Sequence, residues 1–356
     1  MKLVALIEAP DHVCFRYRIQ AFAAALARRD WQLEALPLAK SGFRRVAQLR
    51  SVTTADAVIL QRKLLPPWQL CLLRNSARTL IYDFDDALFH RDSYHPKGTQ
   101  SWQRWAYFWA TIYAADAVTA GNAFLRDQAA AFVPGERVHY FPTCVEPERY
   151  PIAKHERQGG EIKLVWIGQR STLPSLSLAR AHLVAAAAKL PGLQLKVVSD
   201  AFPELEGVTV LRKTWSSQCE AAELAEADIG VSWLPDDPWS RGKCGLKVLQ
   251  FMAAGLPVIA NPVGANCEMV VAGETGFLAS TPDEWAVAIQ RLAVDPELRA
   301  RMGAAGRRRV EREYSVARWS EDFVQRLNSL AGADVKAARQ RQLAGRGRST
   351  VWEAAR

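Results

Sequence analysis

The chain alternates short β-type runs with longer helical stretches, and it does so in two successive series. In the first series the β-type runs are "KLVALIE", "ADAVILQ", "TLIYDF" and "DAVTAG". In the second series they are "IKLVWIG", "LQLKVVS", "VTVLRK", "DIGVSWL" and "PVIAN". Such alternation is typical of βαβ units, in which helices cover a parallel sheet. The sequence therefore predicts an α/β protein built from doubly wound sheets.

A polar, glycine-rich stretch without periodicity separates the two series: "YPIAKHERQGGE", at 150–161. At 356 residues the chain is too long for one ordinary core. We therefore predict two Rossmann-like domains, 1–155 and 156–330, with a ligand in the cleft between them at the carboxyl ends of the strands. Residues 331–356 are predicted to form a basic, flexible tail.

Composition narrows the classes of partner. The formal net charge of +9 favours anionic partners, namely phosphorylated ligands, nucleic acid or an anionic membrane surface. Nucleic acid is disfavoured because the basic residues lack interleaved aromatics in any recognisable module. The six cysteines include no C-x-x-C pair, so neither a zinc site nor a disulfide framework is indicated. The opening "MKLVALIEAP" is expected to be a buried strand rather than a signal peptide, and a cytoplasmic protein is expected.

Two common nucleotide-binding fingerprints are missing from the sequence. No G-x-G-x-x-G follows a strand-type run, as the usual dinucleotide site requires. Gly242 and Lys243 form a "GK" pair, but Cys244 follows in place of Ser or Thr, and Asp237 occupies the position of the upstream glycine. A P-loop nucleotide hydrolase is therefore not indicated.

The stretch "RGKCGLKVLQ" predicts an anion site at the start of a helix. If the helix begins near Cys244 or Gly245, its first N–H groups lack internal partners and carry the positive end of the helix dipole, which suits a phosphate. Lys243, Lys247 and Gln250 are spaced four and three apart and would share one helix edge. An alternative stays open, in which Lys247 lies on a solvated face and Gln250 is a tolerated polar residue.

The second series resembles the donor-binding domain of the family 4 retaining glycosyltransferases (glycosyl transferases group 1), which have the GT-B fold. The resemblance rests on "DIGVSWLPDD", "GLKVLQFMAAGLPVIANPVGANCEMV", "GETGFLA", "VWIGQRST" and "DPELRARMGAAGRRRVEREYS". It is strong over 160–330 and weaker in the first series, where "DAVTAGNAFLRDQ" and "FPTCVEPERY" are similar to the end of an acceptor domain. In this fold a closing helix commonly crosses back to the first domain.

The resemblance implies a set of donor-binding residues. For the diphosphate of a nucleotide sugar these are Gly168, Arg170, Lys243, Cys244, Gly245 and Lys247, and for the ribose Gln250. The family typically has two glutamates eight positions apart, and here they are replaced by Gly242 and Gln250. Gln250 can still bond a ribose hydroxyl. Gly242 cannot reach the donor sugar, so the residue that contacts the sugar stays open.

The polar cluster "YDFDDALFH" is the densest in the first series. Asp85, Asp86 and His90 are the candidate catalytic residues, with an aspartate accepting a hydrogen bond from a sugar or acceptor hydroxyl. Helix N-capping and a divalent metal site are the alternatives. Since the fold that the sequence resembles is metal-independent, we expect no metal and no cofactor beyond the nucleotide-sugar co-substrate.

The expected acceptor-binding residues are two arginines after the first strand and one asparagine. Arg16 and Arg18 could hold an anionic group by bidentate contacts, or could simply be surface arginines at a helix start. Asn122, in "AGNAF", is the third candidate. A glycan or lipid-linked acceptor is expected, with the protein peripheral on the inner face of the cytoplasmic membrane.

The resemblance implies transfer of a sugar to a hydroxyl with retention. The alanine- and arginine-rich composition is consistent with a role in bacterial envelope or exopolysaccharide synthesis. Stabilising the leaving diphosphate would supply most of the catalysis, and no protein nucleophile is needed if that phosphate takes the proton of the acceptor. The alternatives are a nucleotide-sugar 2-epimerase of the same fold and a non-catalytic glycan-binding or scaffold protein. The base, the sugar and the acceptor are not predicted.

Overall fold

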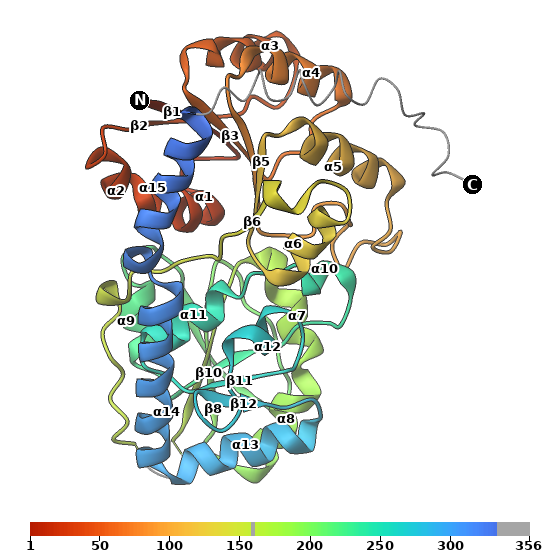
Figure 1. Ribbon diagram of the computed structural model, residues 1–356. Helices are drawn as coiled ribbons and strands as arrows, with labels where there is room; N and C mark the ends of the chain where they lie inside the picture. The colour runs from red at the N-terminus through yellow and green to blue at the C-terminus, as the bar shows by residue number, and fades with distance from the viewer. Residues whose placement is uncertain (158–160, 333–356) are drawn as a thin grey trace.

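A computed structural model describes residues 1–157 and 161–332, and it contains two parallel sheets of six strands each (Figure 1). The predicted α/β, doubly wound architecture is thus confirmed. Most of the basic tail predicted at 331–356 lies outside the described residues. Within the described ranges, no helix has the length and apolar character needed to span a bilayer.

The first sheet has the strand order β2-β1-β3-β4-β5-β6. Its strands are β1 (Lys2–Ile7), β2 (Gln32–Pro37), β3 (Ala57–Gln61), β4 (Leu80–Phe84), β5 (Ala117–Ala120) and β6 (Val138–Tyr140). The central strands β3, β4 and β5 are buried along their whole length. This burial explains their near-continuous apolar sequence, because both faces of a doubly wound sheet are covered by helices.

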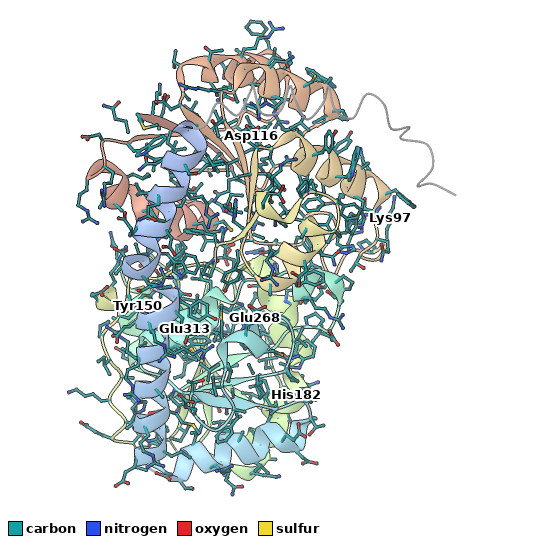
Figure 2. The ribbon with its side chains drawn as sticks, in the orientation of Figure 1. Lys97, Asp116, Tyr150, His182, Glu268 and Glu313 are labelled. Atoms are coloured by element: carbon teal, nitrogen blue, oxygen red, sulfur yellow. The ribbon has the colours of Figure 1, made fainter. Side chains whose placement is uncertain are left out.

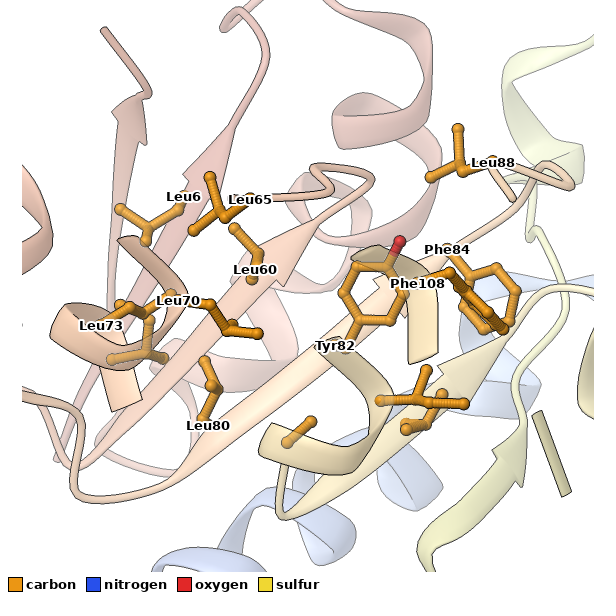
Figure 3. Close-up of a cluster of buried hydrophobic side chains, with 14 of the residues drawn as sticks. Leu6, Leu60, Leu65, Leu70, Leu73, Leu80, Tyr82, Phe84, Leu88 and Phe108 are labelled. Carbon is orange, nitrogen blue, oxygen red and sulfur yellow. The ribbon is translucent and has the colours of Figure 1, made fainter. Parts of the chain in front are cut away.

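The helices of the first half divide between the two faces of its sheet. They are α1 (Val13–Arg18), α2 (Ala23–Ala27), α3 (Gly42–Ser51), α4 (Pro67–Ser76), α5 (Trp102–Ala114) and α6 (Ala123–Ala130). One face packs against α3, α4, α5 and α6 and contains Leu60, Leu73, Tyr82, Phe84 and Phe108 (Figure 3). The other face packs against α1, α2 and the last helix of the chain.

The second sheet has the order β12-β11-β10-β7-β8-β9. Its strands are β7 (Lys163–Ile167), β8 (Gln194–Ser199), β9 (Thr209–Thr214), β10 (Ile229–Ser232), β11 (Val258–Ala260) and β12 (Gly276–Leu278). Its helices are α7 (Leu173–Leu178), α8 (Arg180–Lys189), α9 (Glu220–Ala225), α10 (Pro238–Arg241), α11 (Leu246–Ala253), α12 (Ala265–Met269), α13 (Pro282–Val294) and α14 (Pro296–Arg309). One core lies between this sheet and α8 and α13, and a second lies around α11.

The chain passes between the halves at two places that touch each other. A π turn (Val310–Tyr314) joins α14 to α15 (Val316–Gly332), and α15 packs on the first sheet through Phe323, Val324 and Leu327 (Figure 1). Near this turn, Val145 N–H donates to Tyr314 O at 3.0 Å, and Val316 N–H donates to Val145 O at 2.9 Å. The outgoing and returning segments are therefore hydrogen-bonded to each other.

Candidate active site between the two halves

The loop between α10 and α11 is held against the first half of the chain. A side chain at Gly242 would place its Cβ 2.6 Å from the backbone nitrogen of Ala87. Asn122 Nδ2 donates to the carbonyl oxygens of Arg241 and Lys243, at 3.0 Å each. Cys244 is buried within the core of the first half. The start of α11 is thereby fixed beside the carboxyl ends of β4 and β5.

Asp85 and Asp86 are buried and bound to cations. The guanidinium of Arg62 pairs with both carboxylates, and the Nζ of Lys243 lies 3.0 Å from Asp86 Oδ1. Burial alone would raise the pKa of Asp85, but the guanidinium groups of Arg62 and Arg18 lower it below its ordinary value. Asp85 is therefore suited to accept hydrogen bonds as a carboxylate.

The third catalytic candidate, His90, is buried. His90 is enclosed by the rings of Phe89 and Trp105. Burial lowers the pKa of His90, so the imidazole is neutral at physiological pH. Its Nδ1 has no hydrogen-bond partner in the described ranges. The catalytic roles of Asp85, Asp86 and His90 stay predictions.

Two of the three predicted acceptor-binding side chains are buried and hydrogen-bonded to other residues of the protein. Arg18 is 1% exposed, and its guanidinium binds Asp83 and the carbonyl oxygen of Phe141. Asn122, also 1% exposed, caps α6 through its Oδ1, which accepts from Leu125 N–H at 2.8 Å, while its amide holds the loop before α11. The sequence interpretation of Arg18 as a surface arginine is corrected, and the buried placement of both residues argues against contact with an acceptor.

Arg16 and Gln250 belong to a buried polar network between the halves. Arg16 pairs with Glu220 at 2.7 Å, and Glu220 accepts from the hydroxyl of Tyr17 at 3.0 Å. Gln250 Nε2 donates to the hydroxyl of Tyr17 at 3.1 Å and lies 3.3 Å from that of Tyr150. Tyr150 lies at the level of the junction (Figure 2). In this structure the amide of Gln250 thus contacts tyrosines, and ribose binding stays a prediction.

The ammonium group of Lys247 contacts an aromatic ring and a hydroxyl group rather than a carboxylate. Lys247 lies in the first turn of α11, whose N-cap residue Gly245 has a left-handed backbone (φ 62°) and provides no side-chain cap. Its Nζ lies 3.9 Å from the centroid of the Trp166 ring and 3.4 Å from Thr172 Oγ1. Burial and the neighbouring charge of Lys243 lower the pKa of Lys247 to about 7. Within the described ranges Lys247 pairs with no carboxylate.

Gly168 and Arg170 follow β7, in the loop whose Thr172 contacts Lys247. A Cβ at Gly168 would lie 2.4 Å from the Trp166 ring and 2.6 Å from Thr172 Oγ1, so only glycine fits there. The exposed side chain of Arg170 has no ion-pair partner in the part of the chain that the structure describes, and its backbone N–H donates to Asp200 at 2.7 Å. The loop after β7 and the start of α11 together form an edge that carries the cations Arg170 and Lys247, neither of which pairs with a carboxylate within the described residues.

The predicted grouping of Lys243, Lys247 and Gln250 on one helix edge is not observed. The left-handed backbone of Gly245 starts the helix only at Leu246, so Lys243 lies in the preceding loop and pairs with Asp86. Lys247 and Gln250 both lie in α11 but contact different elements. Diphosphate binding by Lys243 and Cys244 stays a prediction, since one is ion-paired and the side chain of the other is buried.

Metal ligands were the alternative role for the acidic cluster. Across residues 1–157 and 161–332, no three His, Cys, Asp or Glu side chains are placed so that they could hold an ion together. Asp83 binds Arg18, while Asp85 and Asp86 bind Arg62. The carboxylate oxygens are thus directed at guanidinium groups.

Sequence reasoning missed Arg62, Glu220 and the two tyrosines of the network. Arg62 adopts a left-handed backbone (φ 58°), which nothing in "LQRKLL" indicates. Glu220 could have been noticed only as an acidic residue in the first turn of a helix, a position that acidic residues often occupy on solvated surfaces.

Comparison with known proteins adds a family match over the second half. Residues 180–325 match the family model described as glycosyl transferase-like. One curated relative is the GDP-mannose-dependent alpha-(1-6)-phosphatidylinositol monomannoside mannosyltransferase of Mycobacterium tuberculosis, 28% identical over 58% of this chain and 59% of the relative. Across the curated relatives it matches, the chain spans between 20% and 63% of their length.

Solved structures match over nearly the whole chain. Sucrose-phosphate synthase from Thermosynechococcus elongatus aligns with a TM-score of 0.73 at 17% identity, over 93% of this chain and 99% of the other. HepE from Anabaena, in complex with UDP and glucose, aligns with a TM-score of 0.66 at 16% identity, over 93% and 100%. These likenesses confirm the predicted two-domain fold.

Proposed function

We propose that this chain, whose fold and family match resemble those of GT-B glycosyltransferases, transfers a sugar from a nucleoside-diphosphate sugar to a hydroxyl acceptor. The observation that carries the proposal is Lys247. It is a cation without a carboxylate partner among the described residues, placed at the uncapped start of α11, and its Nζ lies 3.4 Å from Thr172 Oγ1 in the loop that also contains the exposed Arg170. A diphosphate would supply the missing negative charge and accept from the free N–H groups.

The donor diphosphate would lie between α11 and the loop after β7. The absence of side chains at Gly168 and Gly245 keeps the approach to the backbone open. Lys247, Arg170 and the positive end of the helix dipole would stabilise the charge that develops on the leaving phosphate. UDP is one suitable probe, because the related fold of HepE holds it.

Asp86 is the acidic group that the fold brings beside Gly242. The Asp86–Ala87 backbone occupies the space that a side chain at Gly242 would need. We infer that the carboxylate of Asp86, held by Arg62 and Lys243, accepts a hydrogen bond from a donor or acceptor hydroxyl. Transfer would occur with retention and without a protein nucleophile, the leaving phosphate taking the acceptor proton on the same face. Metal independence is part of this proposal.

A lipid-linked or glycan acceptor of the cell envelope is the proposed second substrate. The mannosyltransferase relative is named for a phosphatidylinositol mannoside. The net charge of +9 supports a peripheral position on the anionic inner face of the cytoplasmic membrane. Residues 330–356 contribute six Lys or Arg against two acidic residues, although most of this tail lies outside the described residues.

The test is the affinity of Lys247→Ala for UDP and for uridine, measured by calorimetry. We expect a loss of about 1.5 to 3 kcal/mol for UDP, the typical value of a charge-assisted hydrogen bond, and little change for uridine. Lys189→Ala, an exposed lysine of α8, is the matched control. Equal losses for both ligands would reject the diphosphate assignment, and absence of nucleoside-diphosphate release from any nucleotide sugar would reject the transferase function.

A further inference from the structure

Helix α5 turns a row of large aromatic rings outward. Trp102 is 91% exposed, Trp109 48% and Tyr113 36%, and the rings of Trp109 and Tyr113 stack at 5.5 Å. Phe108 and Ile112 of the same helix are buried in the core of the first half, where Figure 3 labels Phe108. We call Trp102, Trp109 and Tyr113 the α5 ridge. Exposed aromatic rings that lie in a row contribute little to the folded core, and such patches commonly bind a partner or a membrane.

The residue types of the α5 ridge favour contact with the surface of a lipid bilayer. Tryptophan and tyrosine combine an apolar body with a polar edge, and they are enriched where a bilayer meets water. Arg104 is the only charged residue of α5. A ridge with no carboxylate of its own can approach anionic headgroups without repulsion.

The segment that contains the ridge carries positive charge. Residues 38–116, which include α3, α4 and α5, contain eleven Lys or Arg against six Asp, a net of five positive charges out of the nine of the whole chain. Arg44, Arg50 and Lys97 are exposed and form no ion pair in the described ranges. Figure 2 shows Lys97 at the outer tip of the loop that leads into α5. This charge complements an anionic leaflet.

The ridge begins next to the candidate active site. Arg104, in the first turn of α5, donates to the carbonyl oxygens of Leu88 at 3.3 Å and His90 at 3.2 Å. These residues follow Asp86 directly in the chain. The first turn of the ridge helix is therefore hydrogen-bonded to the segment that follows Asp86.

We propose that the α5 ridge is the surface by which this protein lies on an anionic phospholipid bilayer. The proposal rests on the proposed function, because it gives that site access to an acceptor embedded in the bilayer. Trp102 and Trp109 enter the headgroup region, while Arg44, Arg50 and Lys97 face anionic lipids. A glycan chain or a second copy of this chain would be a different occupant.

The experiment compares the full chain with Trp102→Ala/Trp109→Ala in sedimentation with vesicles of phosphatidylcholine, with and without phosphatidylglycerol. We expect the double variant to lose at least roughly tenfold in binding to anionic vesicles, since each ring removes large apolar contact area. Arg44→Glu/Arg50→Glu should lose binding only when phosphatidylglycerol is present, as should the wild type in high salt. The matched control is Leu178→Ala/Val294→Ala, which removes exposed apolar side chains from the second half.

UDP affinity is measured on every variant to separate the two proposals. Unchanged UDP affinity together with lost vesicle binding supports the ridge. The proposal is overturned if the tryptophan variant binds vesicles as strongly as the wild type. It is also overturned if vesicle binding is lost only when the residues after Leu330 are removed. A wild-type dimer that becomes a monomer in the variant, or a loss of binding to a soluble glycan alone, also overturns the membrane assignment. If no nucleotide sugar yields a nucleoside diphosphate with the wild type while vesicle binding depends on the ridge, the proposed function fails and the ridge stands.

Discussion

The two polar edges that meet at the junction differ in how their charges are balanced. On the edge of the first half, each cation close to the aspartates has a carboxylate: Arg18 binds Asp83, and Arg62 binds Asp85 and Asp86. On the edge of the second half, Lys247 and Arg170 have none among the described residues. A charge balanced inside the protein stabilises a conformation, whereas an unbalanced one is available to a ligand. The difference supports the proposal that the second edge binds an anion, while the ion pairs of the first edge hold Asp86 in place for its proposed contact with a hydroxyl.

The largest expected effect is loss of stability in Arg18→Ala. The substitution leaves Asp83 charged and buried without its guanidinium, and breaking such a pair typically costs about 3 to 5 kcal/mol. Urea denaturation gives the free energy of unfolding. Arg29→Ala, which removes an exposed pair with Glu321, should cost at most about 1 kcal/mol. Similar values for both variants would show that the first edge is not structural.

Gly242→Ala is expected to have the next largest effect. A Cβ there would meet the backbone of Ala87 at 2.6 Å, and relieving such an overlap costs about 1 to 3 kcal/mol. The halves should therefore separate, visible as a larger radius of gyration in X-ray scattering. Gly135→Ala is the control, because no atom lies within 4 Å of the added carbon. An unchanged radius would mean that the contact is not maintained in solution.

The pH dependence of UDP binding tests the second edge. The pKa of Lys247 is about 7, and a bound diphosphate would raise it. The lysine is charged below this pKa and neutral above it, so affinity should fall by up to roughly tenfold per pH unit between pH 7 and 9, where the diphosphate is fully ionised. Calorimetry should also detect proton uptake on binding. In Lys247→Ala the affinity for UDP should no longer fall with pH over this range. A fall that persists in this variant would have to come from another titrating group.

The smallest expected effect is that of a chelator. If the leaving diphosphate is neutralised by Lys247, Arg170 and the start of α11, treatment with EDTA should leave the release of nucleoside diphosphate unchanged. Loss of turnover with EDTA, restored by Mg²⁺ or Mn²⁺, would instead assign an ion to the leaving group and make the second edge an incomplete site.

The fold was predictable because its signal is repeated and local. Each strand-type run, such as "KLVALIE", carries the apolar character that double-sided burial demands, and β1 occupies Lys2–Ile7 as expected. The start of α11 was predicted within two residues, because glycine and the following apolar spacing indicate it directly.

The contacts of the site were not predictable, because they join residues far apart in sequence. The pairing of Lys243 with Asp86 and of Gln250 with Tyr17 depends on how the halves lie against each other. Periodicity placed Lys243 on the helix, but the left-handed Gly245 moved it into the loop. Arg18 reads as a surface residue in "FRYRIQ", and only its partner Asp83 explains its burial.

The hydrogen-bonded crossing of the chain at Val145 and Val316 has a mechanical consequence. Two covalent connections tied at one place act as a single pivot, so relative movement of the halves should be rotation rather than sliding. In Figure 1 this pivot lies on the left of the junction, while α10 lies on the right. A rigid half works as a lever, and displacement grows with distance from the pivot. The loop at Gly242 should therefore travel farthest on opening, while the Gln250 network, nearer the pivot, should move least.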